Sequence, residues 1–149
     1  TKTTWTSANR LDEIHSSLNE VITNWRPNKA AVEQIFVAKG ADSALKLGMA
    51  RGVAMQTCAG KGLDLTEISA RQVKKAVTGT GAADKTQVAA MVEKLLNIKP
   101  EGLDASDALA IAIAGINMWP NYSIDKTTLP TGNGLKSAIE AALLKEQRR

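Results

Sequence analysis

Two aspartates, Asp104 and Asp107, stand three residues apart at the head of a run that is otherwise small and apolar. In a helix, positions i and i+3 lie on one face, so both carboxylates would point the same way. Residues 108–116 carry no charge, which predicts a helix buried on most sides. Two like charges at the end of a buried helix repel each other and lose hydration, and a divalent cation with a preference for hard oxygen ligands would hold them there.

A structural interpretation of the same acids competes with the metal site. Asp104 can be an N-cap and Asp107 its N3 partner, a carboxylate capping box that the helix dipole favours. The spacing alone favours capping over metal binding, and both interpretations stay open at this point.

A third acid, Glu33, also lies where a charged side chain is energetically unfavourable. Residues 30–37 are small and β-branched and predict a strand, where a buried carboxylate is costly unless it is paired or bound to a metal. A strand end that opens onto a site would remove this conflict. His15, in contrast, is the one histidine of the chain and fits a helix surface or a core edge better than a metal site.

The composition is that of an ordinary globular chain with a modest basic excess. A length of 149 residues with 44% hydrophobic and 23% charged residues suffices for one domain with an aliphatic core. The net charge of +4 is compatible with a nucleic-acid partner without requiring one. Cys58 is the single cysteine, which excludes an intrachain disulfide and favours a reducing, cytoplasmic location. We find no signal peptide and no apolar run of membrane-spanning length, and expect no membrane partner.

Apolar periodicity, caps and breakers predict the elements that must position the acids. Helices are expected over residues 8–25, 41–59, 70–77, 84–97, 103–116 and 135–145, and strands over residues 30–37 and 63–68. Ser69 is expected to cap the helix that carries Arg71 and Lys74 on one face. The turn at residues 78–81 resembles a phosphate-binding loop only superficially, because no strand precedes it and no Gly-Lys-Ser/Thr follows it.

The helix over residues 41–59 contains Gly48 and Gly52, although glycine weakens a helix by about 1 kcal/mol relative to alanine. Close approach of another backbone would explain them, either from a helix of the same chain or from a second copy in a dimer. Further along, a polar segment rich in proline and glycine predicts a linker or mobile loop. We therefore expect one domain over residues 1–119, followed over residues 120–149 by a flexible segment and a C-terminal amphipathic helix.

Four segments in fixed order resemble the RuvC-type Holliday junction resolvases of bacteria. They are AVEQIF at residues 31–36, ADSALKLG at 41–48, ARQVK at 70–74 and DASDALA at 104–110. The resemblance runs from about residue 10 to residue 118. It implies an α/β fold with an RNase H-like mixed sheet flanked by helices, a homodimer, and symmetric metal-dependent cleavage of four-way DNA junctions in recombination and repair. It also implies two Mg²⁺ ions per active site, with Mn²⁺ as a substitute, and a branch-migration motor as a partner.

The resemblance further implies roles for individual residues. Glu33, Asp104 and Asp107 resemble three of the family's four catalytic, metal-binding acids. Lys74 and Lys85 resemble basic residues that contact the scissile region. The remaining expected DNA-binding residues are an aromatic that wedges near the crossover and five cations: Phe36, Lys39, Lys46, Arg51, Arg71 and Lys75. A position in the core is the alternative for the phenylalanine.

The family's fourth acid lies on its first strand in an Asp-Pro-Gly-like motif, and no such motif occurs in this sequence. We therefore expect the chain to begin after the family's first strands. Two other classes of function stay open: a protein that binds junction DNA through its lysines without cutting it, and a structural protein whose acids are helix caps. Metal-dependent nicking of a synthetic junction separates a nuclease from both.

Overall fold

The computed structural model describes residues 5–34 and 40–119 of the chain. They belong to the first of two compact units, Thr1–Trp119, and the second unit is Pro120–Arg149. The helix predicted at residues 135–145 and the loop predicted before it lie outside the described residues, as do Phe36 and Lys39. No helix in the described ranges combines the length and the hydrophobicity that crossing a membrane requires.

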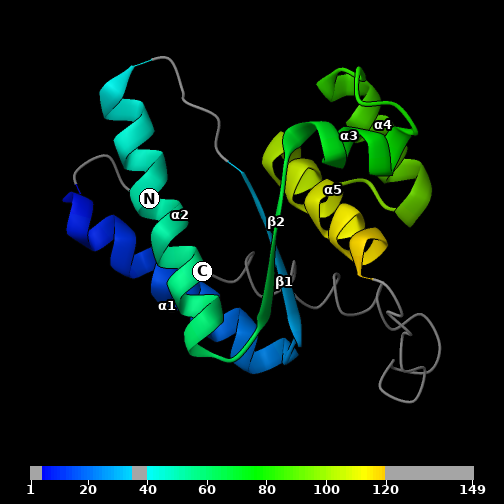
Figure 1. Ribbon diagram of the computed structural model, residues 1–149. Coiled ribbons are helices and arrows are strands. Elements are labelled where there is room, and N and C mark those ends of the chain that lie inside the picture. Colours follow the sequence, from blue (N-terminus) through cyan, green and yellow to red (C-terminus); the bar gives the residue numbers. More distant parts are fainter. Residues whose placement is uncertain (1–4, 35–39, 120–149) are drawn as a thin grey trace. The chain divides into compact units, whose positions relative to one another are not determined.

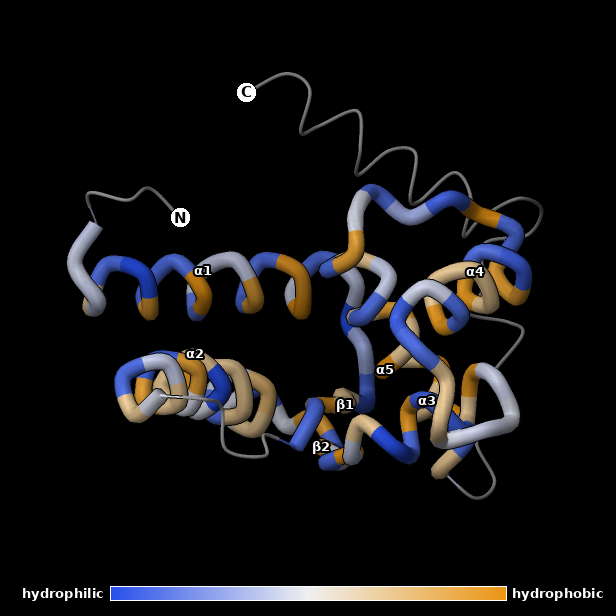
Figure 2. The backbone as a smooth tube through the Cα atoms, turned by 90° about the horizontal axis from the view of Figure 1, so that it is seen from above, coloured by the Kyte–Doolittle hydropathy of each residue, from blue (hydrophilic) through white to orange (hydrophobic). Residues whose placement is uncertain are grey.

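Two long helices flank the first strand in the sequence and pack against each other. α1 (Ser7–Trp25) begins where Oγ1 of Thr6 accepts a hydrogen bond from the backbone N–H of Asn9 at 3.2 Å, an N-cap interaction. It ends at Arg26, which adopts a left-handed conformation with φ of 46°. The side of α1 that faces α2 (Ala41–Gly60) carries its hydrophobic residues, and the helices are in contact along this side (Figure 2).

Two parallel strands form the sheet of the described residues. β1 (Lys29–Glu33) pairs with β2 (Asp64–Ile68) in a register that places Lys29 opposite Asp64 and Glu33 opposite Ile68. Parallel strands need a crossover connection, and α2 provides it. The predicted α/β class is confirmed, and the described part of the predicted mixed sheet consists of this parallel pair.

β1 ends at Glu33, where its partner strand stops, and residues 35–37 of the predicted strand lie outside the described residues. β2 ends at Ile68, and the next residue, Ser69, already caps the following helix. The hydroxyl of Ser69 accepts a hydrogen bond from the backbone N–H of Gln72, and the Gln72 side chain accepts one from the backbone N–H of Ser69. This capping box confirms the predicted cap at Ser69.

Three helices follow β2 and enclose the core: α3 (Ala70–Thr78), α4 (Lys85–Leu96) and α5 (Gly102–Met118). Asp84 caps α4 in the same reciprocal way, with Gln87 as its partner. The buried cluster between these helices and β2 is aliphatic, as the composition predicts: Ile68, Val73, Val77, Ala83, Val88, Val92, Ala110 and Ala114.

α5 packs closely on the sheet (Figure 1). A Cβ built at Gly115 would lie 2.9 Å from the Cβ of Ala31, so glycine permits the close approach to β1. Just past the helix, Nε1 of Trp119 donates a hydrogen bond to Oγ1 of Thr66 at 2.9 Å. The indole ring also lies 5.1 Å from Nζ of Lys29, a cation–π contact. These contacts fix α5, and with it the acids near its start.

The structure tests two expectations about α1 and α2, the position of His15 and the reason for the glycines Gly48 and Gly52. Nδ1 of His15 lies 2.9 Å from Oγ1 of the buried Thr57, which confirms a position at the edge of the helix contact. Gly48 and Gly52 are exposed, and no described atom outside their own helix lies within 4 Å of a Cβ built at either. Close packing against another described part of the chain is therefore the wrong explanation for these glycines, and the dimer interface stays a prediction.

Candidate active site

Glu33 is the last residue of β1, and its side chain is exposed. The backbone beyond it is still paired, because the N–H of Gln34 donates to the carbonyl oxygen of Ile68 at 2.8 Å. The sequence suggested a carboxylate in the middle of a buried strand, and the structure instead places it at a strand end. The expectation that a strand end resolves this conflict is confirmed.

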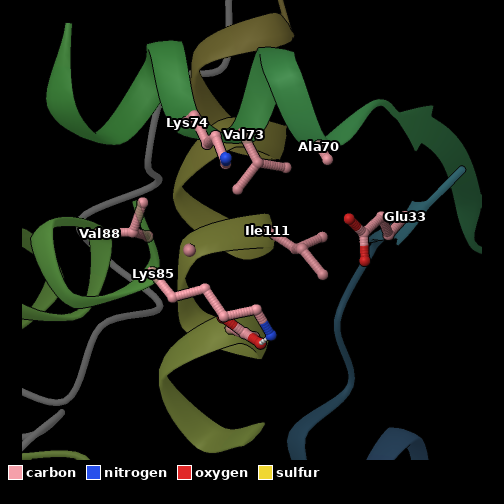
Figure 3. Close-up of a pocket in the computed structure, with 9 residues that line it drawn as sticks. Glu33, Ala70, Val73, Lys74, Lys85, Val88 and Ile111 are labelled. Atoms are coloured by element: carbon pink, nitrogen blue, oxygen red, sulfur yellow. Dashed lines mark hydrogen bonds and ion pairs between the residues drawn. The ribbon is translucent and has the colours of Figure 1, made fainter. Parts of the chain in front are cut away.

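A pocket of about 130 Å³ lies next to Glu33, between β1, α3, α4 and α5 (Figure 3). Its charged lining consists of two acids and two lysines: Glu33, Lys74, Lys85 and Asp107. Its apolar lining comes from the three helices: Ala70, Val73, Val88, Ala110 and Ile111. The position follows from the topology, since α3 starts directly after β2 and therefore begins beside the carboxyl end of β1. Ligands of parallel sheets commonly bind at this edge.

Four of the five residues that were predicted to be catalytic thus meet in one pocket. Sequence reasoning did not identify the apolar lining. Val73 and Val88 show the helical spacing of ordinary core residues, and both are buried members of the core cluster. No sequence signal distinguishes a core valine from one whose side chain also forms the wall of a pocket.

Lys85 and Asp107 form an ion pair across the pocket, with Nζ 3.3 Å from Oδ2. The lysine side chain is 75% exposed and the aspartate side chain 44% exposed. An exposed pair of this kind contributes about 0–1 kcal/mol, so its partners exchange readily for others. Lys85 is therefore close enough to neutralise Asp107 and free enough to turn towards an anionic ligand.

Asp104 does not line the pocket, and it is not a helix cap. α5 begins at Gly102 with Glu101 as its N-cap residue, and no side chain caps it by a hydrogen bond. Asp104 lies within the first turn, where the helix dipole favours a negative charge, and Asp107 follows one turn later. The capping-box interpretation of the two aspartates is therefore wrong, because the helix starts three residues earlier than that interpretation requires.

The donor set of the pocket suits a hard divalent cation, although the acids do not form a compact cluster. Within residues 5–34 and 40–119, no group of three histidine, cysteine, aspartate or glutamate side chains is close enough to hold a metal ion. Glu33 and Asp107 nevertheless line one pocket. Mg²⁺ commonly takes one or two protein carboxylates and completes its shell with water and substrate phosphate oxygens. Two carboxylates on one pocket fit that requirement.

The predicted DNA-binding cations fall into two groups. Lys46 on α2 and Arg71 and Lys75 on α3 are exposed. Arg51 is instead engaged within the chain: its guanidinium donates to the carbonyl oxygen of Glu33 and to the carboxylate of Glu67. Arg51 was predicted to contact DNA, and no role was predicted for Glu67.

Cys58 has no place in this pocket. Burial raises the pKa of its thiol, which lowers the fraction of the reactive thiolate. Chemistry at the pocket is therefore left to its carboxylates and lysines.

Comparison with known proteins identifies relatives along most of the chain. The model of the family described as "Crossover junction endodeoxyribonuclease RuvC" matches residues 1–115. The RuvC protein of Marinobacter nauticus is 53% identical over 113 residues, which cover 74% of this chain and 64% of that protein. The RuvC protein of Idiomarina loihiensis is 50% identical over 115 residues, which cover 76% of this chain and 64% of that protein. The chain thus spans a little under two thirds of the length of these curated relatives.

Two solved structures of Thermus thermophilus RuvC have the same fold. One has a TM-score of 0.69 at 34% sequence identity, and the match covers 76% of this chain and 70% of that chain. The other is of RuvC in complex with Holliday junction substrate, with a TM-score of 0.72 at 33% identity and the same coverage.

Proposed function

Because the chain belongs to the RuvC family of crossover junction endodeoxyribonucleases, we propose that it resolves four-way DNA junctions by metal-dependent phosphodiester hydrolysis. The observation that carries this proposal is the pocket that brings Glu33 and Asp107 together with Lys74 and Lys85. A protein that only binds DNA needs the lysines, but it has no use for two carboxylates that repel the phosphates. The family's nuclease domain then corresponds to residues 1–119.

The chemistry follows from the types of side chain around the pocket. Glu33 and Asp107 would hold Mg²⁺, with Asp104 as a further acid one turn away on α5. Mg²⁺ bound at this site would lower the pKa of a coordinated water and neutralise charge on the phosphate oxygens. We assign two ions to each site, with Mn²⁺ as a substitute, since paired ions stabilise both the attacking and the leaving oxygen.

The two lysines complete the electrostatics of the site. Lys74 and Lys85 place ammonium groups at the pocket, where negative charge builds up on the phosphate in the transition state. Lys85 neutralises Asp107 in the free protein, and its exposed side chain exchanges that partner for a phosphate oxygen when DNA arrives. Nearby, the exposed cations Lys46, Arg71 and Lys75 would contact the DNA backbone.

We further propose that the working form is a homodimer that meets its partner through α2. Five exposed residues at helical spacing form one stripe along this helix, and most of them are small or apolar: Leu45, Gly48, Gly52, Gln56 and Ala59. The glycines leave room for a second backbone. A two-fold dimer matches the two-fold symmetry of a four-way junction and would cut two strands symmetrically. We also propose that the protein is cytoplasmic and that it acts together with a branch-migration motor.

Cleavage of a synthetic four-way junction tests the proposed function. With Mg²⁺ or Mn²⁺, the full chain should introduce paired nicks at symmetric positions, and a chelator should abolish the nicks while binding persists. A linear duplex of the same sequence is the control and should stay intact. Binding should weaken with salt at a logarithmic slope of about −0.9 per phosphate neutralised. Tight junction binding without any metal-dependent nicking would contradict the proposal and favour a binding protein.

A further inference from the structure

Arg51 of α2 joins the carboxyl ends of both strands. Its Nε donates a hydrogen bond to the backbone carbonyl oxygen of Glu33 at 3.0 Å. Its Nη2 donates to Oε2 of Glu67, which stands opposite the residue before Glu33 in the strand register. The arginine side chain is 21% exposed and the glutamate side chain 44% exposed, so the contact is half-buried. One guanidinium therefore links α2, the end of β1 and β2.

The carbonyl that Arg51 contacts belongs to the residue whose carboxylate lines the pocket. Beyond Glu33, the N–H of Gln34 still pairs with the carbonyl oxygen of Ile68 at 2.8 Å. These two hydrogen bonds hold the peptide that follows Glu33 from both of its sides. Because the peptide plane and the Cα position set where the side chain starts, they determine where the Glu33 carboxylate reaches.

The chemistry of the guanidinium explains why an arginine serves this purpose. Its N–H donors lie in a rigid plane, so two of them can bind a carbonyl and a carboxylate at the same time, which a lysine ammonium on a flexible stem does less well. Glu67 fixes the orientation of that plane and balances its charge. A guanidinium held in this way is directed into the protein and away from a DNA phosphate.

We propose that Arg51 is a positioning residue for Glu33, with Glu67 holding the guanidinium in place. The inference rests on the proposed nuclease function in so far as Glu33 is a catalytic acid. It replaces direct DNA contact as the main role of Arg51.

The same two strands offer a matched control at their opposite end. Nζ of Lys29 lies 2.5 Å from Oδ2 of Asp64, and the two residues are register partners. Their side chains are 26% and 64% exposed, which is comparable to the Arg51–Glu67 pair. Asp64→Asn removes the charge of this pair and leaves the contact of Lys29 with the Trp119 ring intact. Any general effect of losing an ion pair from the sheet should appear in this variant too.

The kinetic test compares Arg51→Met, Glu67→Ala and Asp64→Asn in single-turnover cleavage of a four-way junction. Arg51→Met and Glu67→Ala should slow cleavage at saturating protein by about tenfold or more, because small displacements of catalytic groups are costly. Junction affinity in chelator should stay within about twofold of the parent. Glu67→Gln keeps an acceptor oxygen and should recover most of the rate. A large loss of affinity with an unchanged saturated rate in Arg51→Met would overturn the inference in favour of a DNA contact, and an equal slowing in Asp64→Asn would overturn it in favour of sheet stability.

A second readout is independent of cleavage. Hydrogen exchange at the Gln34 amide, measured by NMR in the metal-free chain, should speed up by about tenfold or more in Arg51→Met and Glu67→Ala, since local opening governs such exchange. The Asp64 amide, which donates to the carbonyl of Asn28 at 3.2 Å at the other end of the sheet, should not change. Unchanged exchange at Gln34 would overturn the positioning role whatever the cleavage result. If the parent chain cuts no junction at all, the proposed function fails, while the exchange data still decide whether Arg51 holds the strand end.

Discussion

At the level of single residues, the pocket brings together side chains of opposite charge from different helices and a strand. Glu33 reaches it from a strand end and Asp107 from the second turn of α5. Lys74 and Lys85 reach it from two further helices. Each acid therefore has a cation within the same pocket, which limits repulsion between the carboxylates when no metal is bound.

The acids should be essential for cleavage and dispensable for folding. Asp107→Asn is expected to lower the cleavage rate by about 100-fold or more, because it removes a carboxylate that would hold the metal ion on which hydrolysis depends. Junction binding in chelator should persist, since one fewer negative charge faces the phosphates. The same losses are expected for Glu33→Gln and Asp104→Asn, measured by single-turnover cleavage.

Thermal unfolding provides a second check on the acids. Asp107→Asn gives up only an exposed ion pair of about 0–1 kcal/mol, so its Tm in chelator should stay close to that of the parent. Mg²⁺ should raise the Tm of the parent more than that of the variant, because a ligand stabilises the state that binds it. Glu101→Gln, at the N-cap without a side-chain cap hydrogen bond, is the control and should behave like the parent in every assay.

The lysines should separate into catalytic and binding groups. Lys74→Ala and Lys85→Ala are expected to lower the saturated cleavage rate more than the junction affinity, because they act on the transition state. Lys75→Ala removes an exposed lysine of α3 that does not line the pocket, and it should lower affinity and reduce the salt slope with little change in the saturated rate. Equal losses of rate and affinity in all three variants would reduce Lys74 and Lys85 to ordinary backbone contacts.

Sequence reasoning found the acids because their positions were physically anomalous, whereas the roles of Lys74 and Lys85 came from the family resemblance. Glu33 in a strand and two aspartates before an apolar run each needed an explanation. The capping interpretation of Asp104 failed because the start of α5 is set by the chain at Gly102, with φ of 84°, which spacing alone does not reveal. The contact of Arg51 with the carbonyl of Glu33 joins elements far apart in the sequence and leaves no local pattern.

At the level of elements, helices were predicted more accurately than strands. Ser69 and Asp84 are local signals that act on residues only three positions away, so the starts of α3 and α4 could be located from the sequence. The end of β1 depends on where β2 stops pairing with it, which is information from another segment. The sequence pattern alone therefore did not place the end of β1 at Glu33.

Gly115 should be the least replaceable glycine of α5. Gly115→Ala places a Cβ 2.9 Å from the Cβ of Ala31 and 3.2 Å from Cη2 of Trp119, so α5 or β1 must shift. Overpacking of this kind costs about 1–3 kcal/mol, which denaturant unfolding would measure. Gly60→Ala is the control, because its Cβ would meet only Nε2 of Gln56 at an ordinary 3.7 Å. If both variants lose the same stability, the close approach at Gly115 is not the cause.

At the level of the whole molecule, the exposed stripe on α2 is the feature that the single chain leaves unexplained. Leu45 is 63% exposed, and Gly48 and Gly52 have open space around them within the described residues. Glycine weakens a helix, and no contact inside the described chain compensates for it. A second copy packed on this stripe would supply the missing contacts.

Gly48→Leu should therefore convert dimers to monomers. Among the described residues a Cβ at this position meets open space, so folding should be unaffected, while a partner backbone close to Gly48 would exclude the new side chain. Sedimentation would detect the change in mass, and circular dichroism would confirm the fold. Lys46→Leu adds the same side chain on another face of the helix and should leave the dimer intact. A Gly48→Leu variant that stays dimeric would refute this placement of the interface.

Because Trp119 is attached to the sheet, a small tilt of α5 about this residue would displace the acids near the start of the helix. The residue lies twelve positions beyond Asp107, which corresponds to about 18 Å at the helical rise of 1.5 Å per residue. A tilt of about 5° at the tryptophan would move Asp107 by about 1.5 Å, a displacement that typically costs orders of magnitude in rate. The hydrogen bond to Thr66 and the contact with Lys29 thus hold one end of a helix whose other end carries the acids. Changes far from the pocket can in this way retune the geometry of the acids without touching them.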